Sequence, residues 1–192
     1  MIVAIAGGTG SGKTTVSKAM KESYSQRFSI NVAVVSMDNY YRNENSEKFD
    51  NYDHPGAFDI DLLYGDLYTF LSTGKIVKRS YDYVTKKRSI IKTQSNVKVL
   101  ILEGLYPFYE KKIRDLCSLK LYLDVNEVVR HQRRISRDLK ERNISVEENM
   151  KMIDDFVKQM HEKYVAKQKN MADKLCTDSE DVLALLQYTV SP

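Results

Sequence analysis

The sequence predicts an α/β fold in which a doubly wound parallel β-sheet is flanked by helices. Four short apolar runs rich in β-branched residues alternate with longer segments of helical periodicity. The runs are continuously apolar instead of alternating with polar residues, which is typical of parallel strands covered on both faces. Strand–helix alternation of this kind indicates an α/β architecture, and we expect residues 1–192 to form a single domain.

The individual elements follow from these runs and from the segments between them. The expected strands are Ile2–Ala6, Val32–Met37, Val97–Leu102 and Leu119–Val125. The expected helices are Lys13–Phe28, Ile60–Thr73, Glu127–Arg142 and a further helix from Ser145. Residues 76–92 interrupt this alternation, because two short runs, Val77–Tyr81 and Arg88–Lys92, flank a polar turn. They predict a β-hairpin that projects from the core.

The helix expected over 127–142 has two unlike sides. At about 100° per residue, Val128 and Leu139 lie within about 40° of Ile135. The opposite side carries the arginines, which are Arg130, Arg133 and Arg137, with Arg134 beside them. We expect Arg130 and Arg133 to be solvated, as on an ordinary helix surface. With the polar loop that follows it, this basic helix predicts a helical lid over residues 127–145.

The next helix begins with a sequence typical of a helix start. Ser145 and Glu148 have the spacing of a capping box, in which each side chain satisfies a backbone N–H of the other residue. The helix carries an apolar stripe that we assign to packing, formed by Met150, Ile153, Val157, Met160 and Tyr164. We find no internal repeat and no low-complexity linker that would divide the chain.

The composition excludes several classes of function. The chain has 30 Lys and Arg against 26 Asp and Glu, which gives a net charge of only +4. A nucleic-acid-binding protein would more often concentrate positive charge on one face, so we expect no nucleic acid partner. Cys117 and Cys176 have no spacing that suggests a disulfide or a zinc site. No stretch has the length of a signal peptide or a membrane span, and we expect a cytoplasmic protein.

Residues 7–14 match the phosphate-loop pattern G-x-x-x-x-G-K-[ST] between an expected strand and an expected helix. In such a loop, backbone N–H groups and the N-terminus of the helix bind phosphate oxygens. The lysine contacts the β- and γ-phosphates, and the last hydroxyl can bind Mg²⁺. We therefore expect ATP (or GTP) with Mg²⁺ as cofactors. The expected nucleotide-binding residues of the loop are Gly7, Gly8, Thr9, Gly10, Ser11, Gly12, Lys13, Thr14 and Thr15.

Two other classes of nucleotide-binding protein fit the sequence less well. A dinucleotide-binding loop requires the spacing G-x-G-x-x-G, whereas Gly8, Gly10 and Gly12 simply alternate. A GTPase switch would need the guanine-reading motif Asn-Lys-x-Asp, which the sequence does not contain. The loop therefore favours a fold of the P-loop NTPase type with kinase activity.

Acidic residues follow two of the expected strands. Asp38 comes after Val32–Met37, and Glu103 comes after Val97–Leu102. Ligands of open α/β sheets bind at the carboxyl ends of the strands. We expect Asp38 to be the general base that accepts a hydroxyl proton, and Glu103 to hold Mg²⁺ together with Thr14. The alternative for each acid is a capping or turn residue.

Phosphoryl transfer also needs cations that neutralise the migrating group. Lys13 is the first of these cations, and the predicted lid supplies the others. The lid candidates are Arg134, Arg137 and Arg142. We assign Arg137 to catalysis and Arg142 to the nucleotide.

Taken together, these motifs resemble the uridine kinase (uridine–cytidine kinase) family. The matching segments are the phosphate loop, Met37–Tyr41, Asn51–Asp59, Tyr81–Tyr83, Leu102–Gly104, Arg133–Asp138 and Arg142. They appear in the order of the family over residues 2–158. The Tyr-Asp-His-Pro block at residues 52–55 is the most specific of them, because related P-loop kinases lack it.

The resemblance implies an enzyme that transfers a phosphoryl group from ATP to the 5′-hydroxyl of a nucleoside, uridine or cytidine. It implies that Asp38 is the general base. The implied acceptor site consists of Asp53 and Arg134 on the ribose and of Tyr52, Tyr81 and Tyr83 on the base. The implied phosphate ligands of the lid are Arg137 and Arg142. The resemblance further implies a homo-oligomer, a tetramer or a dimer, that associates partly through the hairpin.

The chain departs from the family pattern mainly around the acceptor and near its C-terminus. Lys86 replaces a base-contacting histidine, and Asn143–Ile144 replaces a Gly-Arg pair. Lys86 lies in a polar turn, where it is either solvated or reaches the acceptor. The apolar strand usual in the family after Asp173 is missing from the sequence. The acceptor thus stays open between a nucleoside and another hydroxyl compound, such as nicotinamide riboside, pantothenate or a sugar phosphate. A catalytically weak nucleoside-binding homologue is a further alternative.

Overall fold

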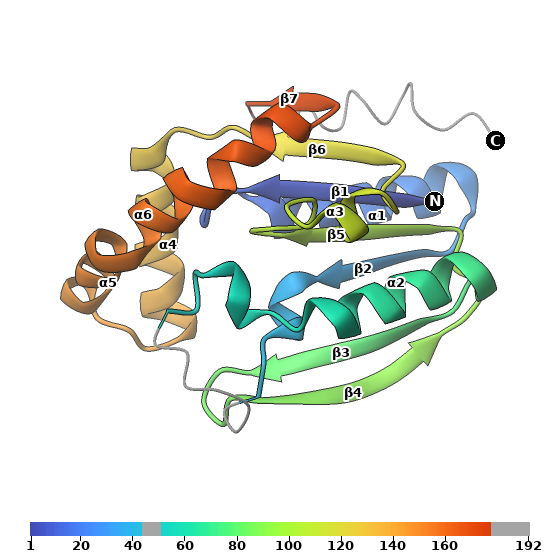
Figure 1. The fold of residues 1–192 in the computed structure, drawn as a ribbon, viewed down its shortest axis with the longest axis horizontal. Helices are drawn as coiled ribbons and strands as arrows, with labels where there is room; N and C mark the ends of the chain where they lie inside the picture. Colours follow the sequence, from blue (N-terminus) through green and yellow to red (C-terminus); the bar gives the residue numbers. More distant parts are fainter. Residues whose placement is uncertain (44–50, 178–192) are drawn as a thin grey trace.

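The structure, a computed structural model, describes residues 1–43 and 51–177. Its centre is a five-stranded sheet (Figure 1). In spatial order the strands are β2 (Val32–Ser36), β5 (Val99–Gly104), β1 (Ile2–Gly7), β6 (Leu119–Leu123) and β7 (Lys174–Cys176). Every pairing in this sheet is parallel, as the continuous apolar runs predict. The predicted α/β fold is therefore confirmed, with β1 at the centre of the sheet.

Helices cover both faces of the sheet, with α1 behind it and α2 and α3 in front of it in the view of Figure 1. The helices are α1 (Lys13–Phe28), α2 (Ile60–Thr73), α3 (Lys111–Arg114), α4 (Glu127–Glu141), α5 (Val146–Met152) and α6 (Lys158–Met160). Local signals set the ends of α2, because Asp59 caps its first turn and Gly74 ends it with φ 66°. Within residues 1–43 and 51–177, no helix is long and apolar enough to cross a membrane.

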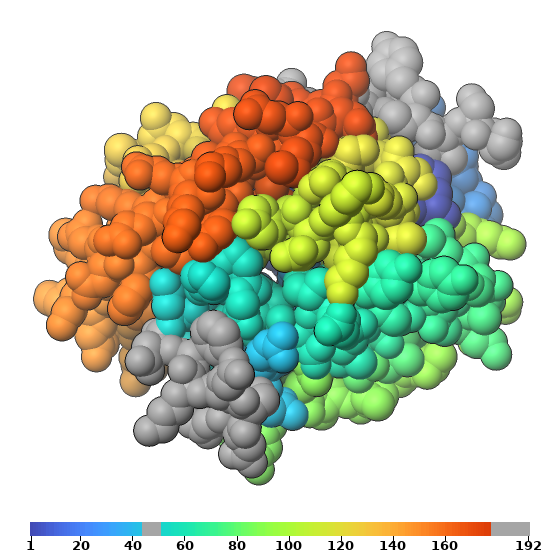
Figure 2. All heavy atoms as spheres, viewed as in Figure 1, coloured from blue at the N-terminus to red at the C-terminus, as the bar shows by residue number. Residues whose placement is uncertain are grey.

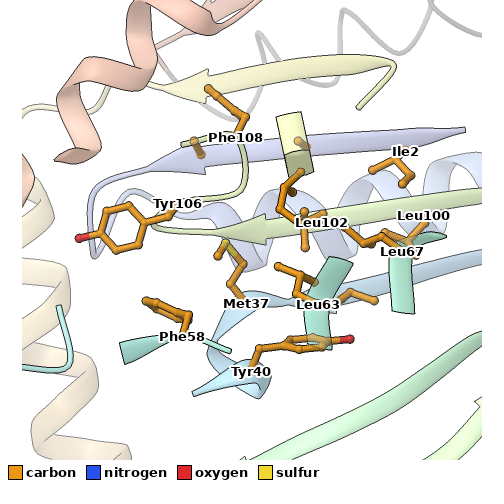
Figure 3. Packing of buried hydrophobic residues seen from close by; sticks show 14 of the residues in the cluster. Ile2, Met37, Tyr40, Phe58, Leu63, Leu67, Leu100, Leu102, Tyr106 and Phe108 are labelled. Atoms are coloured by element: carbon orange, nitrogen blue, oxygen red, sulfur yellow. The ribbon is translucent and has the colours of Figure 1, made fainter. Parts of the chain in front are cut away.

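The pleat of β1 divides the hydrophobic core into two layers. Val3 and Ile5 point toward α1 and pack in one cluster with Met20 of that helix. Ile2 points to the other face, where it belongs to the cluster that includes Leu63 of α2 (Figure 3). All five side chains are fully buried, and each contributes roughly 1.5–3 kcal/mol through the hydrophobic effect. The strand that leads into the phosphate loop is thus held from both sides.

Two strands differ from the expectation. β5 extends to Gly104, so Glu103 lies within the strand and not after it. The short strand β7 pairs with β6 although no strand is expected after Asp173. Of its three residues only Cys176 is buried, and for that reason the sequence shows no apolar run there. The remainder of that C-terminal segment, residues 178–192, lies outside the described residues.

The expected hairpin is present and lies beside α2 (Figure 1); its strands, β3 (Ile76–Asp82) and β4 (Lys87–Gln94), pair antiparallel. Arg79 of β3 donates from Nε and Nη2 to the Asp66 carboxylate of α2 at 2.6 and 3.0 Å. Tyr40 Oη donates to the same carboxylate at 2.9 Å. The carboxylate of Asp66 therefore joins the hairpin, helix α2 and the 3₁₀ turn η1 (Met37–Tyr40).

The helical segment after Ser145 is less regular than the expected single helix. Its predicted capping box is present. The segment then contains two π-helical turns, at Ile153–Val157 and His161–Val165, which rotate the buried side relative to a regular helix. Both ends of the first π turn are buried, but Met150 is 55% exposed. The predicted packing stripe is therefore wrong at Met150.

Helix α4 buries its charged side instead of its apolar side. Arg130 and Arg134 are only 4% and 5% exposed, whereas Val128 and Leu139 are 62% and 50% exposed. The expectation of a solvated Arg130 is wrong, although Arg133 is exposed as expected. The reason is that this side of α4 packs on polar groups of the phosphate loop and the cavity described below, not on the apolar core.

We expect Asp66→Ala to destabilise the fold by about 3 kcal/mol, because it leaves the Arg79 guanidinium and the Tyr40 hydroxyl unpaired where only 12% of the Arg79 side chain is exposed. Urea unfolding followed by circular dichroism measures the change. A suitable control is Asp115→Ala, which removes the exposed ion pair to Lys111 and should cost less than about 1 kcal/mol. Equal effects of the two substitutions would contradict a structural role of Asp66.

Candidate active site

A cavity of about 1000 Å³ opens at the carboxyl edge of the sheet. Its walls come from the loop after β1, the turn η1 after β2, the end of β5, the turn of the β3–β4 hairpin and the second half of α4 with the residues that follow. Parallel strands end at the same edge of a sheet, and ligands of such sheets bind there. Candidate residues that are far apart in the sequence therefore meet in one space.

The loop after β1 combines left-handed glycines with the start of a helix, two features that suit phosphate binding. Gly10 and Gly12 have φ angles of 74° and 93°, in the left-handed region that favours glycine. Helix α1 begins directly after this loop, and its N-terminus favours negative charge. Lys13 Nζ donates to Gly8 O at 2.9 Å, so the side chain folds back over the loop. Burial lowers the pKa of Lys13, and the carboxylate of Glu103 is the main group that opposes this shift.

Arg130 does not line the cavity but supports the phosphate loop. A Cβ atom added at Gly10 would lie 2.0 Å from Arg130 O, and one added at Gly8 would lie 2.3 Å from Arg130 Nη1. The guanidinium is fixed in turn, because its Nε donates to Val125 O at 3.0 Å. The loop therefore packs directly on α4, and this close approach requires glycine at both positions.

Thr14 and Glu103 provide the oxygen atoms expected to hold Mg²⁺. Thr14 Oγ1 donates to Glu103 Oε1 at 3.3 Å. Burial raises the pKa of Glu103, whereas the charge of Lys13 lowers it. Mg²⁺ is usually bound by one or two protein oxygens together with phosphate oxygens and water, so this pair fits the ion. Within the described residues, no cluster of three or more His, Cys, Asp or Glu side chains forms a separate metal site.

Asp38 lies on the turn η1 and lines the cavity. Ser36 caps this turn, because its Oγ accepts from the backbone N–H of Asp38 at 3.4 Å. The Asp38 carboxylate is close enough to Lys13 to oppose, after Glu103, the lowering of the Lys13 pKa by burial. Its Oδ2 accepts a hydrogen bond from Tyr83 Oη at 2.9 Å. Asp38 is therefore placed at the strand end, as expected, but with a tyrosine donor that the sequence did not indicate.

The three tyrosines named from the sequence surround a fourth, Tyr41. The ring centroid of Tyr41 lies 5.6, 5.3 and 6.2 Å from those of Tyr52, Tyr81 and Tyr83. Tyr41 also stacks on Phe58 at 4.4 Å, and burial raises the pKa of its hydroxyl. All four tyrosines line the cavity. This aromatic wall (Tyr41, Tyr52, Tyr81 and Tyr83) suits a flat ligand with polar edges.

Asp53 meets the lid helix at the cavity, where Arg134 Nη1 donates to Asp53 Oδ1 at 3.4 Å. The segment with Asp53 packs against the helices that follow α4, shown in cyan and orange in Figure 2. His54 fixes this segment, since its Nδ1 accepts from Gly56 N–H at 3.0 Å and its Nε2 lies 3.3 Å from Tyr164 Oη. The structure therefore brings together the two residues expected on the ribose.

Asp138, which sequence reasoning missed, holds the lid arginines together. Its side chain is fully buried, and Oδ1 accepts from Arg137 Nε at 2.8 Å. Arg142 Nη1 lies 3.5 Å from the same oxygen, and Arg134 Nε lies 3.4 Å from Oδ2. The one usable signal in the sequence is that Asp138 is the only acid between Arg130 and Lys140.

The residues that depart from the family pattern also line the cavity, and they are Lys86, Asn143 and Ile144. Lys86 Nζ lies 5.9 Å from the centroid of the Tyr52 ring. Of the two alternatives for Lys86, the structure therefore favours the one in which it reaches the cavity. Asn143 follows Arg142, the C-cap of α4, and adopts φ 54°, a left-handed conformation that asparagine tolerates at a helix end.

Not every residue expected to bind the nucleotide lines the cavity. Those that do are Thr9, Gly10, Lys13 and Thr14 of the loop and Arg142 of the lid. Four other residues of the same loop do not line the cavity, and they are Gly7, Gly8, Ser11 and Gly12. Thr15 is exposed on the first turn of α1, and its role in binding stays a prediction.

Comparison with known proteins identifies the family of this chain. The model of the phosphoribulokinase/uridine kinase family matches residues 2–183. The chain belongs to this family. A protein named uridine kinase from Staphylococcus aureus (strain JH9) is 37% identical over 179 residues, covering 90% of this chain and 84% of that protein. Another, from Listeria monocytogenes serotype 4a (strain HCC23), is 34% identical over 180 residues with the same coverage. Membership of this family makes the chain a phosphotransferase enzyme.

Solved structures share the fold. A possible uridine kinase from Bacillus stearothermophilus superposes with a TM-score of 0.69 at 16% identity, covering 91% of this chain and 87% of the other. The phosphoribulokinase from Rhodobacter spheroides gives a TM-score of 0.65 at 14% identity, covering 90% and 68%. These likenesses support the P-loop kinase architecture, while the assignment to the family comes from the sequence matches.

We expect Asp138→Asn to lower the free energy of unfolding by about 3 kcal/mol, because three guanidinium groups lose the buried charge that they share. The freed arginines should then bind added polyanions, so tripolyphosphate should raise the melting temperature of the variant more than that of the wild type. Asp154→Asn, at an exposed ion pair, should leave both quantities nearly unchanged. An equal response of Asp138→Asn and wild type to tripolyphosphate would contradict this account.

Proposed function

We propose that this protein is an ATP-dependent nucleoside kinase, which phosphorylates the 5′-hydroxyl of uridine or cytidine to give the monophosphate and ADP. The observation that carries the proposal is one cavity lined by the phosphate loop, by Asp38 and by the Asp53–Arg134 pair with the aromatic wall. The names of the relatives at 34–37% identity support the same reaction.

The phosphate end of the cavity would bind ATP through the loop after β1. Lys13 is free to exchange its bond with Gly8 O for phosphate oxygens, since its amine is the mobile cation of the loop. Thr14 and Glu103 would hold Mg²⁺, which would neutralise part of the negative charge of the bound phosphates. Arg137 and Arg142 of the lid would neutralise charge that develops on the transferred group.

The acceptor end would hold the nucleoside between Asp53 and the aromatic wall. The Asp53 carboxylate and the Arg134 guanidinium offer acceptors and donors for the ribose hydroxyls. The rings of Tyr52 and Tyr81 offer flat surface for the base. Asp38 would then accept the proton of the 5′-hydroxyl while that oxygen bonds to the γ-phosphorus and the bond to ADP breaks. Association of the subunits through the β3–β4 hairpin stays a prediction.

The test is an acceptor screen with ATP and Mg²⁺, in which ADP formation is measured by a coupled assay. Uridine or cytidine should be turned over, and Asp38→Asn should lower the rate by roughly 10²- to 10⁴-fold while ATP binding by calorimetry is retained. Lys18→Ala, on the exposed side of α1, serves as the control and should behave as wild type. Turnover only of nicotinamide riboside, pantothenate or a sugar phosphate would refute the nucleoside assignment. An unchanged rate in Asp38→Asn would refute the base.

Lys86 should make the enzyme favour uridine over cytidine. An ammonium group offers donors only, so it can bind a uracil carbonyl but opposes the amino group of cytosine. We expect roughly tenfold selectivity in kcat/KM, which Lys86→His should reduce because histidine offers a donor and an acceptor. Lys87→His, at the exposed neighbouring position, is the matched control. Identical uridine-to-cytidine ratios in wild type and Lys86→His would show that Lys86 does not contact the base.

A further inference from the structure

The tip of the hairpin reaches the proposed general base. Tyr83, directly after β3, donates from its hydroxyl to Asp38 Oδ2 at 2.9 Å. The two residues are 45 positions apart in the sequence, and the ion pair between Arg79 and Asp66 fixes the hairpin that carries Tyr83. The oxygen that should receive a proton from the acceptor is thus already bound to a protein hydroxyl.

The ring of Tyr83 is held independently of its hydroxyl. The guanidinium carbon of Arg142 lies 4.4 Å from the centroid of this ring, a cation–π geometry. The rings of Tyr81 and Tyr41 lie 5.4 and 6.2 Å away. Although 43% of Tyr83 is exposed, partial desolvation raises the pKa of its hydroxyl and the charge of Asp38 raises it further, so the phenol stays protonated and donates. These ring contacts can persist when the hydroxyl loses its bond to Asp38.

We propose that Tyr83 is a selectivity residue, which lets Asp38 act on the acceptor hydroxyl but not on water. Its hydroxyl occupies Oδ2 of the Asp38 carboxylate until a bound acceptor replaces it. The inference rests on the proposed function because that function identifies the acceptor. The competition between Tyr83 and water at Asp38 does not depend on which acceptor is used.

The reaction with water is the side reaction that such a kinase must suppress. A water molecule at Asp38 would give its proton to the carboxylate, its oxygen would bond to the γ-phosphorus, and the bond to ADP would break. The products are ADP and inorganic phosphate, so ATP is lost without transfer. Water is abundant and small enough to enter an open cavity, and position alone cannot exclude it.

The phenol and the acceptor differ from water in how firmly they are held. Little free energy is gained when a loose water molecule replaces the Tyr83 hydroxyl as the hydrogen-bond donor to the charged Asp38 oxygen. An acceptor held by Asp53 and Arg134 presents its hydroxyl at a high effective concentration, so it can displace the phenol. A positioned acceptor hydroxyl can therefore displace the Tyr83 hydroxyl from Asp38, whereas a free water molecule cannot.

The experiment measures ADP release from ATP and Mg²⁺ without any acceptor. Tyr83→Phe keeps the ring and its contact with Arg142 but removes the hydroxyl, and we expect hydrolysis to rise about tenfold. Tyr83→Leu should show the same rise, because the effect depends on the hydroxyl. In the background of Asp38→Asn, Tyr83→Phe should produce no rise. Tyr68→Phe, exposed on α2, should hydrolyse ATP at the wild-type rate.

A second measurement, with a nucleoside present, distinguishes a failure of this inference from a failure of the proposed function. With uridine present, Tyr83→Phe should lower the KM of the acceptor, since the acceptor no longer displaces a phenol, and the change in KM should exceed the change in kcat. A rise in hydrolysis without turnover of any nucleoside would refute the proposed acceptor and support the role of Tyr83. Unchanged hydrolysis in Tyr83→Phe, with melting temperature and ATP binding retained, would overturn the inference. So would an equal loss of transfer and hydrolysis, because Tyr83 would then only orient Asp38.

Discussion

The buried carboxylate of Asp138 is the interaction on which the lid side of the site depends. Three guanidinium groups, from Arg134, Arg137 and Arg142, lie within 3.5 Å of its oxygens. Without an internal counter-charge, a helix could not bury a basic face against the rest of the protein, because an unpaired buried charge costs several kcal/mol. With it, α4 turns its valines and Leu139 outward and presents arginines to the cavity from a rigid element.

The burial of the charged side of α4 also links the lid to the phosphate loop. The charged face that holds Asp138 also carries Arg130, whose backbone and guanidinium leave no room for side chains at Gly8 and Gly10. The loop and the lid arginines are therefore positioned by one helix. Asp53 completes this arrangement from a segment on the other side of the cavity, through its ion pair with Arg134.

The fold and the phosphate end of the site were predictable because their signals are local. A glycine-rich loop between an apolar strand and a helix needs no knowledge of distant residues, and Asp38 and Glu103 are found by the ends of their strands. The faces of α4 were not predictable in this way, because hydrophobic periodicity assumes that the apolar side is buried. That assumption fails where the buried partners are charged.

Contacts that depend on tertiary structure could not be predicted from the sequence either. The bond between Tyr83 and Asp38 requires the hairpin to be held on α2 by Arg79 and Asp66, a pair whose register no local pattern reveals. Strand β7 has one buried residue of three, so only its pairing with β6 identifies it. The π-helical turns after α5 shift the buried side within a helix that a regular periodicity of 3.6 cannot describe.

The aromatic wall gives the protein an intrinsic optical reporter. The chain contains 13 tyrosines, six phenylalanines and no tryptophan, so its fluorescence comes mainly from tyrosine, because phenylalanine emits only weakly. Four of these rings line the cavity, and one of them is hydrogen-bonded to a carboxylate, a contact that commonly quenches phenol emission. Ligand entry into the cavity would therefore change the fluorescence of the unlabelled protein, without a background from indole.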